Sequence, residues 1–128
     1  MFDPRLSRQY LRKKQEALQG KRLILWKKAV EESQAIVKMI LEKYHPQALI
    51  QWGSVLDPKH FSEISDIDLA VAGLESLTFM KLLADAEALT TFPLDIVQWE
   101  AIHPSFQKII LMKGKLLHGK GESLITHQ

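Results

Sequence analysis

The sequence contains no cysteine, which excludes disulfide bridges, cysteine-ligated zinc sites and a thiol nucleophile. It also has no apolar run approaching the roughly 20 residues that a helix needs to span a bilayer. The first residues, MFDPRLSRQYLRKK, are rich in charge and include no apolar stretch like that of a signal peptide. We therefore expect a cytoplasmic protein that makes no use of a membrane.

The sequence has little net charge, but its charged residues are unevenly placed along the chain. The 128 residues carry a net charge of +2, whereas residues 1–28 alone hold nine Lys/Arg and two Asp/Glu, a net +7. The remaining residues, 29–128, carry a net −5. A basic N-terminal segment of this kind can meet nucleic acid or an acidic protein surface. It can equally be a solvated helix face.

The N-terminal third of the chain has helical hydrophobic spacing. We predict one helix over residues 5–19, an interruption at Gly20, and a second helix over 21–44 that His45-Pro46 ends. Leu6, Tyr10, Leu11 and Leu18 make an apolar stripe on the first helix. Because such a short segment has little reason to stay folded alone, we expect it to pack on a partner or on a second copy. A self-contained hairpin of the two helices is the alternative.

The rest of the chain alternates short apolar runs with helical patterns. The apolar runs predict strands at 48–52, 66–72 and 93–99, and helices are predicted at 76–89 and 104–113. This order predicts an α/β (α+β) domain with a small mixed three-stranded sheet packed with helices. We expect a helical extension over 1–44, a core over 45–120 and a flexible tail over 121–128.

Carboxylates occupy two of the predicted strands. Asp66 and Asp68 are two residues apart and therefore point to the same face of a strand. Asp95 interrupts the apolar run LDIV on the third predicted strand, where an unpaired charge is costly. Neighbouring carboxylates repel one another unless a cation or a proton lies between them. Three such groups suit Mg²⁺, and two ions can activate an attacking oxygen and stabilise a leaving pyrophosphate. Asp is also common at the start of strands for purely structural reasons.

A Gly-Ser pair follows the first predicted strand. Gly53 would let backbone N–H groups approach a phosphate, and the Ser54 hydroxyl would add a donor. Taken alone, Gly-Ser is more typical of a simple turn.

Together, the run QWGSVLDPKHFSEISDIDLAVAGL and the later PLDIVQW resemble the minimal nucleotidyltransferases of the DNA polymerase β superfamily. The resemblance implies their nucleotidyltransferase fold and two divalent ions, Mg²⁺ or alternatively Mn²⁺, on catalytic Asp66, Asp68 and Asp95. It implies that Gly53 and Ser54 contact the triphosphate of ATP, and Ser65 falls on the serine of the family's Ser-Asp-x-Asp pattern. The implied reaction transfers a nucleoside monophosphate to an acceptor hydroxyl.

The chain departs from the family pattern just after Gly-Ser. Members commonly carry Arg-Ala-Arg-Gly there, whereas this chain has Val-Leu-Asp-Pro at positions 55–58. The usual arginines are missing, and Asp57 adds negative charge near the expected phosphates. Lys59 or His60 could substitute for them.

The family also implies a partner, because its usual companion is a small all-helical HEPN protein. The pair acts as toxin and antitoxin, and the transferase adenylylates a tyrosine of its partner. Two alternatives stay open from the residues. The same fold can act as a binding module that neutralises a partner by contact alone. It can also transfer nucleotides to RNA ends or a small molecule, with the basic segment as electrostatic guide.

Overall fold

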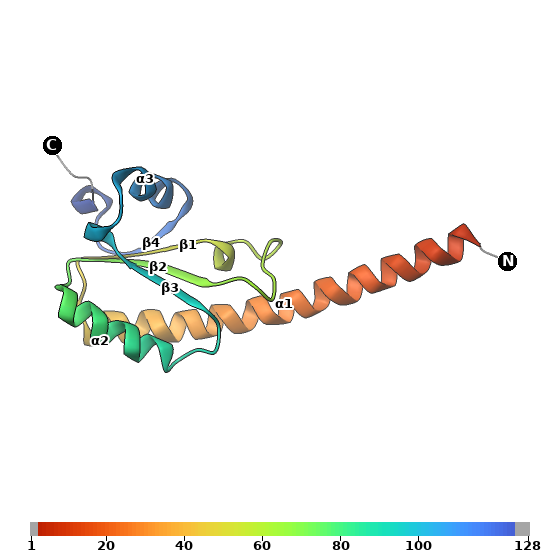
Figure 1. The fold of residues 1–128 in the computed structure, drawn as a ribbon, viewed down its shortest axis with the longest axis horizontal. Coiled ribbons are helices and arrows are strands. Elements are labelled where there is room, and N and C mark those ends of the chain that lie inside the picture. Colours follow the sequence, from red (N-terminus) through yellow and green to blue (C-terminus); the bar gives the residue numbers. More distant parts are fainter. Residues whose placement is uncertain (1–2, 125–128) are drawn as a thin grey trace.

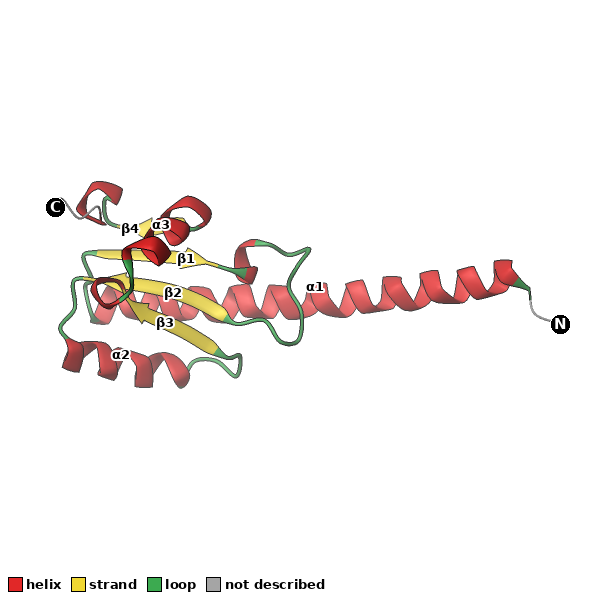
Figure 2. Ribbon diagram, turned by 45° about the horizontal axis from the view of Figure 1, so that its top comes forward, coloured by secondary structure: helices red, strands yellow, loops and turns green. Residues whose placement is uncertain are grey.

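The computed structural model describes residues 3–124 as one mixed sheet with helices on both faces (Figures 1 and 2). Two helices, α1 and α2, lie on one face of the sheet, and α3 lies on the other. The elements in chain order are α1 (Pro4–Lys43), β1 (Ala48–Trp52), β2 (Ile67–Ala72), α2 (Ser76–Glu87), β3 (Leu94–Gln98), α3 (Pro104–Lys113) and β4 (Lys115–His118). The predicted mixed α+β class is confirmed.

The sheet has four strands in the order β3-β2-β1-β4, one more than the sequence predicted. β1 is antiparallel to both β2 and β4, whereas β2 and β3 run parallel and are joined through α2. The missed strand, β4, has only four residues, which is too short for a recognisable alternation. It exists because its backbone pairs with β1, an interaction that sequence spacing does not reveal.

The interruption predicted at Gly20 is wrong, because α1 is one helix of 40 residues. A glycine inside a helix costs about 1 kcal/mol relative to alanine, and good helix formers on both sides offset that amount. The helix begins after Asp3, whose side chain accepts a hydrogen bond of 2.9 Å from the Arg5 backbone N–H. It ends before His45, which has a positive φ of 49°, and Pro46.

Alternation along the strands separates two apolar clusters. The larger cluster joins α1 and α2 to one face of the sheet through Ile36, Ile40, Leu49, Ile67, Leu69, Val71 and Leu82. The smaller cluster joins α3 to the other face through Ile50, Ala70, Trp99 and Ile110. Gln51 points toward α1, where its amide donates a 2.6 Å hydrogen bond to the buried Ser33 hydroxyl. Only the C-terminal half of α1 therefore belongs to the core.

The ends of the predicted domain map are described in part. Gly121–Leu124 forms a short 3-10 helix with Leu124 buried, and residues 125–128 of the expected tail lie outside the described residues. The division between an extension and a core at residue 44 stays a prediction. Within residues 3–124, no helix is both long and apolar enough to cross a membrane.

Candidate active site

The predicted aspartates lie at the end of the sheet where β1 stops and β2 and β3 start. Trp52, Asp68 and Asp95 are register partners across these three strands. Asp68 is half-buried and Asp95 is exposed. Asp66, which the sequence placed on the strand, instead directly precedes β2 and is half-buried. The adjacent register of Asp68 and Asp95 follows from the parallel pairing of their strands.

The carboxylates influence one another electrostatically. Partial burial, together with the negative charges of Asp95 and Asp66, raises the pKa of Asp68 to about 7. Both causes disfavour the ionised carboxylate, and a cation at this point would relieve both. This is the electrostatic character expected of a site that receives positive charge.

Gly53 makes room for the Asp68 carboxylate at the end of β1. Its φ of +82° lies in the region that L side chains rarely adopt. Ser54 then begins a short 3-10 helix, η1 (Ser54–Leu56), in which Val55 is buried. The indole N–H of Trp26 on α1 donates a 2.9 Å hydrogen bond to the Val55 carbonyl. The long helix therefore holds the Gly-Ser turn in place beside the aspartates.

The loop after η1 uses several of its polar residues internally. The His60 ring pairs with the Asp57 carboxylate, and this hydrogen bond holds the pKa of Asp57 below its usual value. The Lys59 backbone N–H also bonds to Asp57, while the residue is exposed. Ser65 is buried, and its hydroxyl accepts a hydrogen bond from the Ser62 N–H. Ser65 thus closes the loop just before the aspartates.

A metal ion would find oxygen donors here but no closed set of ligands. Within residues 3–124, no group of three or more His, Cys, Asp or Glu side chains has an arrangement that could hold a metal ion. The structure therefore brings the aspartates to one end of the sheet without converging all three on a point. Their carboxylate chemistry and the raised pKa of Asp68 fit a hard divalent cation.

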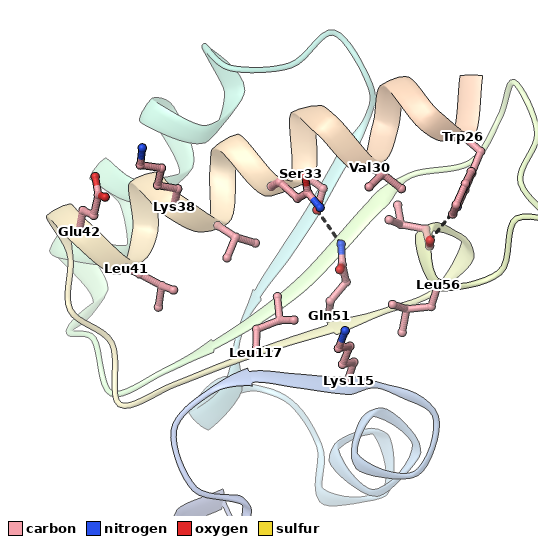
Figure 3. A pocket seen from close by; sticks show the side chains of 13 residues that line it. Trp26, Val30, Ser33, Lys38, Leu41, Glu42, Gln51, Leu56, Lys115 and Leu117 are labelled. Atoms are coloured by element: carbon pink, nitrogen blue, oxygen red, sulfur yellow. Dashed lines mark hydrogen bonds between the residues drawn. The ribbon is translucent and has the colours of Figure 1, made fainter. Parts of the chain in front are cut away.

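A groove lies elsewhere in the described part of the molecule, between α1 and the β1–β4 side of the sheet (Figure 3). It has a volume of about 660 Å³, and Gln51 with its bond to Ser33 lies inside it. Trp26, Val30, Leu41, Leu56 and Leu117 give it an apolar lining. None of the three aspartates lines it, and we place the candidate chemistry at the aspartates because the charges gather there.

Trp52 lies beside the aspartates, a position that the sequence did not reveal. It lies opposite Asp68 in the register, and its ring meets the Phe106 ring of α3 edge-on at 6.0 Å. Trp52 therefore forms an aromatic wall next to the carboxylates. Its place directly before Gly53-Ser54 was the available signal.

The family model for polymerase beta nucleotidyltransferases matches residues 34–123, so this chain belongs to that nucleotidyltransferase family. The resemblance predicted from the motifs is thereby confirmed. Residues 1–33, which include the projecting half of α1, precede the match. No curated protein matches the chain.

Three solved structures illustrate the likeness in fold. A toxin–antitoxin structure with AMP-PNP aligns with a TM-score of 0.59 at 20% identity, covering 72% of this chain and 77% of that chain. A Shewanella oneidensis tri-AMPylated HEPN toxin in complex with MNT antitoxin gives 0.55 at 18% identity, covering 74% and 76%. A structure described as that of a minimal nucleotidyltransferase gives 0.56 at 24% identity, covering 70% of this chain and 93% of that one. The expected nucleotidyltransferase fold is confirmed.

Proposed function

We propose that this chain is a metal-dependent nucleotidyltransferase that moves a nucleoside monophosphate from ATP to an acceptor hydroxyl. The observation that carries the proposal is the placement of Asp68 against Asp95 and Gly53 at one end of the sheet. The solved toxin–antitoxin structure with AMP-PNP supports a nucleotide triphosphate as substrate.

The residues divide the work by their chemistry. Asp66, Asp68 and Asp95 would hold two Mg²⁺ ions, or Mn²⁺ in their place. When bound, these ions neutralise the charge that develops on the transferred and leaving phosphates. The backbone at Gly53 and the Ser54 hydroxyl would position the triphosphate. Lys59, an exposed cation in the following loop, would contribute a positive charge to nucleotide binding. Ser65 shapes the loop that carries Asp66 to the site.

We further propose that the acceptor is a HEPN-type helical protein and that this chain is its antitoxin, acting in the cytoplasm. The complex of an AMPylated HEPN toxin with an MNT antitoxin supports this assignment. The compact sheet leaves no separate acceptor domain within residues 45–124. An external protein acceptor would supply the hydroxyl that the reaction needs.

A contact-only binding module is the second candidate, and the altered loop favours it. Where family members carry arginines, Asp57 pairs with His60 and places an acidic group near the expected phosphates. Such a protein would neutralise its partner with or without nucleotide. The two candidates differ in whether ATP is consumed.

The test is ATP-dependent labelling of a co-purified HEPN-type acceptor by the full chain with Mg²⁺. Asp66→Asn and Asp68→Asn should each lower the transfer rate by about a thousandfold or more, because charge stabilisation of the transition state is lost. Glu87→Gln removes an exposed carboxylate of α2 and is the matched control. The contact-only module would be established by two results together. The wild type would transfer no nucleotide, and both aspartate variants would still neutralise the partner.

A further inference from the structure

The N-terminal half of α1 extends beyond the sheet (Figures 1 and 2). We call residues 4–25 the arm, which is about 33 Å long at the helical rise per residue. Residues 8–21 are exposed throughout. The arm leaves the body at Trp26, whose indole bonds to the carbonyl of Val55 next to the Gly-Ser turn. It therefore projects from the same end of the sheet that holds the aspartates.

One side of the arm continues the buried side of α1. Leu11, Leu18 and Leu25 are spaced by seven residues, and Ala29 and Ile36 follow at spacings of four and seven. These intervals return to nearly the same side of a helix. Ala29 and Ile36 are fully buried against the sheet, whereas Leu11 and Leu18 are 60% and 41% exposed. The core-facing stripe thus continues past the sheet with nothing covering it among the described residues.

The apolar stripe that the sequence predicted on residues 5–19 therefore does not form one surface, because its residues lie on two sides of α1. Leu6 is about 140° around the helix axis from Leu11, which places it on the outer side of the arm. Ile24 is on the outer side as well, about 120° from Leu18. Both are exposed, at 63% and 70%. Of these four residues, Leu11 and Leu18 lie on the side of the helix that Ala29 and Ile36 bury against the sheet.

Cations surround these two leucines. Arg8 and Lys14 lie three residues on either side of Leu11, and Lys21 and Arg22 lie three and four residues after Leu18. Residues at these separations are neighbours on a helix surface, and no acidic residue occurs at any of them. The Arg22 Nε is shielded from water and has no hydrogen-bond partner within residues 3–124. This inner side presents leucines in a ring of uncompensated positive charge.

We infer that the inner side of the arm docks an acidic amphipathic helix on the surface of the protein acceptor and so holds the acceptor at the aspartates. The inference rests on the proposed function for the identity of the acceptor. Leucines two turns apart within a ring of cations match a helix whose apolar residues are flanked by carboxylates. A second arm would set cations against cations, and an RNA backbone would leave the leucines uncovered.

The first test compares two double variants of the full chain, with the co-purified HEPN-type protein as the probe. Leu11→Gln/Leu18→Gln alters the inner side, and Leu6→Gln/Ile24→Gln makes the same kind of change on the outer side. The inner pair should weaken acceptor binding, measured by calorimetry, by about tenfold or more. It should raise the KM for the acceptor while leaving the affinity for AMP-PNP unchanged. Equal effects of the two pairs would overturn the inference.

A second comparison tests the role of the cations with two double variants that change the net charge by the same amount. Lys14→Glu/Lys21→Glu reverses inner cations, and Lys13→Glu/Lys27→Glu reverses cations on other sides of the same helix. We expect the inner pair to reduce the association rate more and to flatten its salt dependence. If Leu11→Gln/Leu18→Gln converts the free chain from a dimer to a monomer, as measured by light scattering, the surface binds a second copy of the chain. Loss of RNA binding with intact acceptor binding would assign it to RNA, and either result overturns the inference.

The two proposals fail in different ways. Asp68→Asn should abolish transfer while acceptor affinity stays intact, because Asp68 lies outside the arm. If the wild type transfers no nucleotide but the inner pair still weakens acceptor binding, catalysis fails and the docking surface stands. If the wild type does not bind the acceptor protein, the docking surface is overturned.

Discussion

The Asp68 carboxylate lies against the α-carbon of Gly53. A Cβ at Gly53 would come within 2.1 Å of Asp68 Oδ2 and 3.0 Å of its Cγ. Even a methyl group would therefore have to displace the carboxylate. The Asp68 carboxylate occupies the space that a side chain at Gly53 would need, so this arrangement requires glycine.

Gly53→Ala should disrupt the candidate site more than any neighbouring change of similar size. The clash and the positive φ of 82° both oppose alanine. We expect the free energy of unfolding to fall by about 1–3 kcal/mol in urea titrations. Nucleotide transfer should fall with it. Gly121→Ala is the control, because a Cβ at Gly121 meets nothing within 4 Å.

Asp68→Asn should stabilise the metal-free protein at high pH. Folding raises the pKa of Asp68 from its usual value of 3.8 to about 7. Between these values the folded state holds the extra proton, so the free energy of unfolding falls as the pH rises toward 7. After allowance for partial exposure, the variant should be about 1–2 kcal/mol more stable than wild type at about pH 8.

The measurement is urea unfolding in EDTA at several pH values. The stabilisation by Asp68→Asn should shrink as the pH falls toward about 4, where both states are protonated. Glu87→Gln, which removes the same charge from an exposed position, serves as control. Equal stabilities of Asp68→Asn and wild type across the range would contradict the raised pKa.

Gly20→Ala should stabilise the helix of the arm without changing the stability of the core. A glycine within a helix costs about 1 kcal/mol relative to alanine, and a Cβ at Gly20 would meet no atom within 4 Å. Amide hydrogen exchange of residues 5–19 should therefore slow by about fivefold, while exchange in the sheet stays unchanged. Gly20→Pro should have the opposite effect. Arm amides that exchange at unfolded-chain rates in every variant would mean that the helix begins after Gly20.

Ser33→Ala should destabilise the packing of α1 on the sheet. The Ser33 hydroxyl accepts the Gln51 amide inside the protein, and both residues are buried. Its removal would leave the Gln51 amide unpaired and cost about 1–3 kcal/mol in thermal or urea unfolding. Ser76→Ala, at an exposed position on α2, should cost less than about 0.5 kcal/mol. Similar losses in the two variants would contradict a structural role for this bond.

The parts of the fold with strong local signals could be predicted from the sequence. Alternation and apolar runs located β1, β2 and β3 to within one residue at each end, but they did not determine the parallel pairing that sets Asp68 beside Asp95. β4 could not be found, because its four residues take their order from pairing with β1. Gly20 misled because local propensity is weak next to the cooperativity of a long helix.

The site was predicted as a set of residue types but not as a geometry. The spacing of Asp66 and Asp68 predicted only that both point to one face of a strand, and the raised pKa of Asp68 depends on burial that no spacing gives. The contact of Gly53 with Asp68 and the bond from Trp26 to Val55 likewise join residues distant in sequence. The roles of Gly53, Ser54, Lys59 and Ser65 toward a nucleotide stay predictions.

The exposed arm also makes the chain separable by a protease. Residues 1–28 contain nine lysines and arginines, most of them on a stretch of helix that packs on nothing described in the structure. Local opening is easiest where buried contacts are fewest, so trypsin should cut there long before it reaches the sheet. Such a cut would leave every aspartate of the candidate site in the larger fragment. A bound acceptor would shield the same peptide bonds. The rate at which trypsin cleaves the arm would therefore measure the fraction of the chain that is bound to the acceptor.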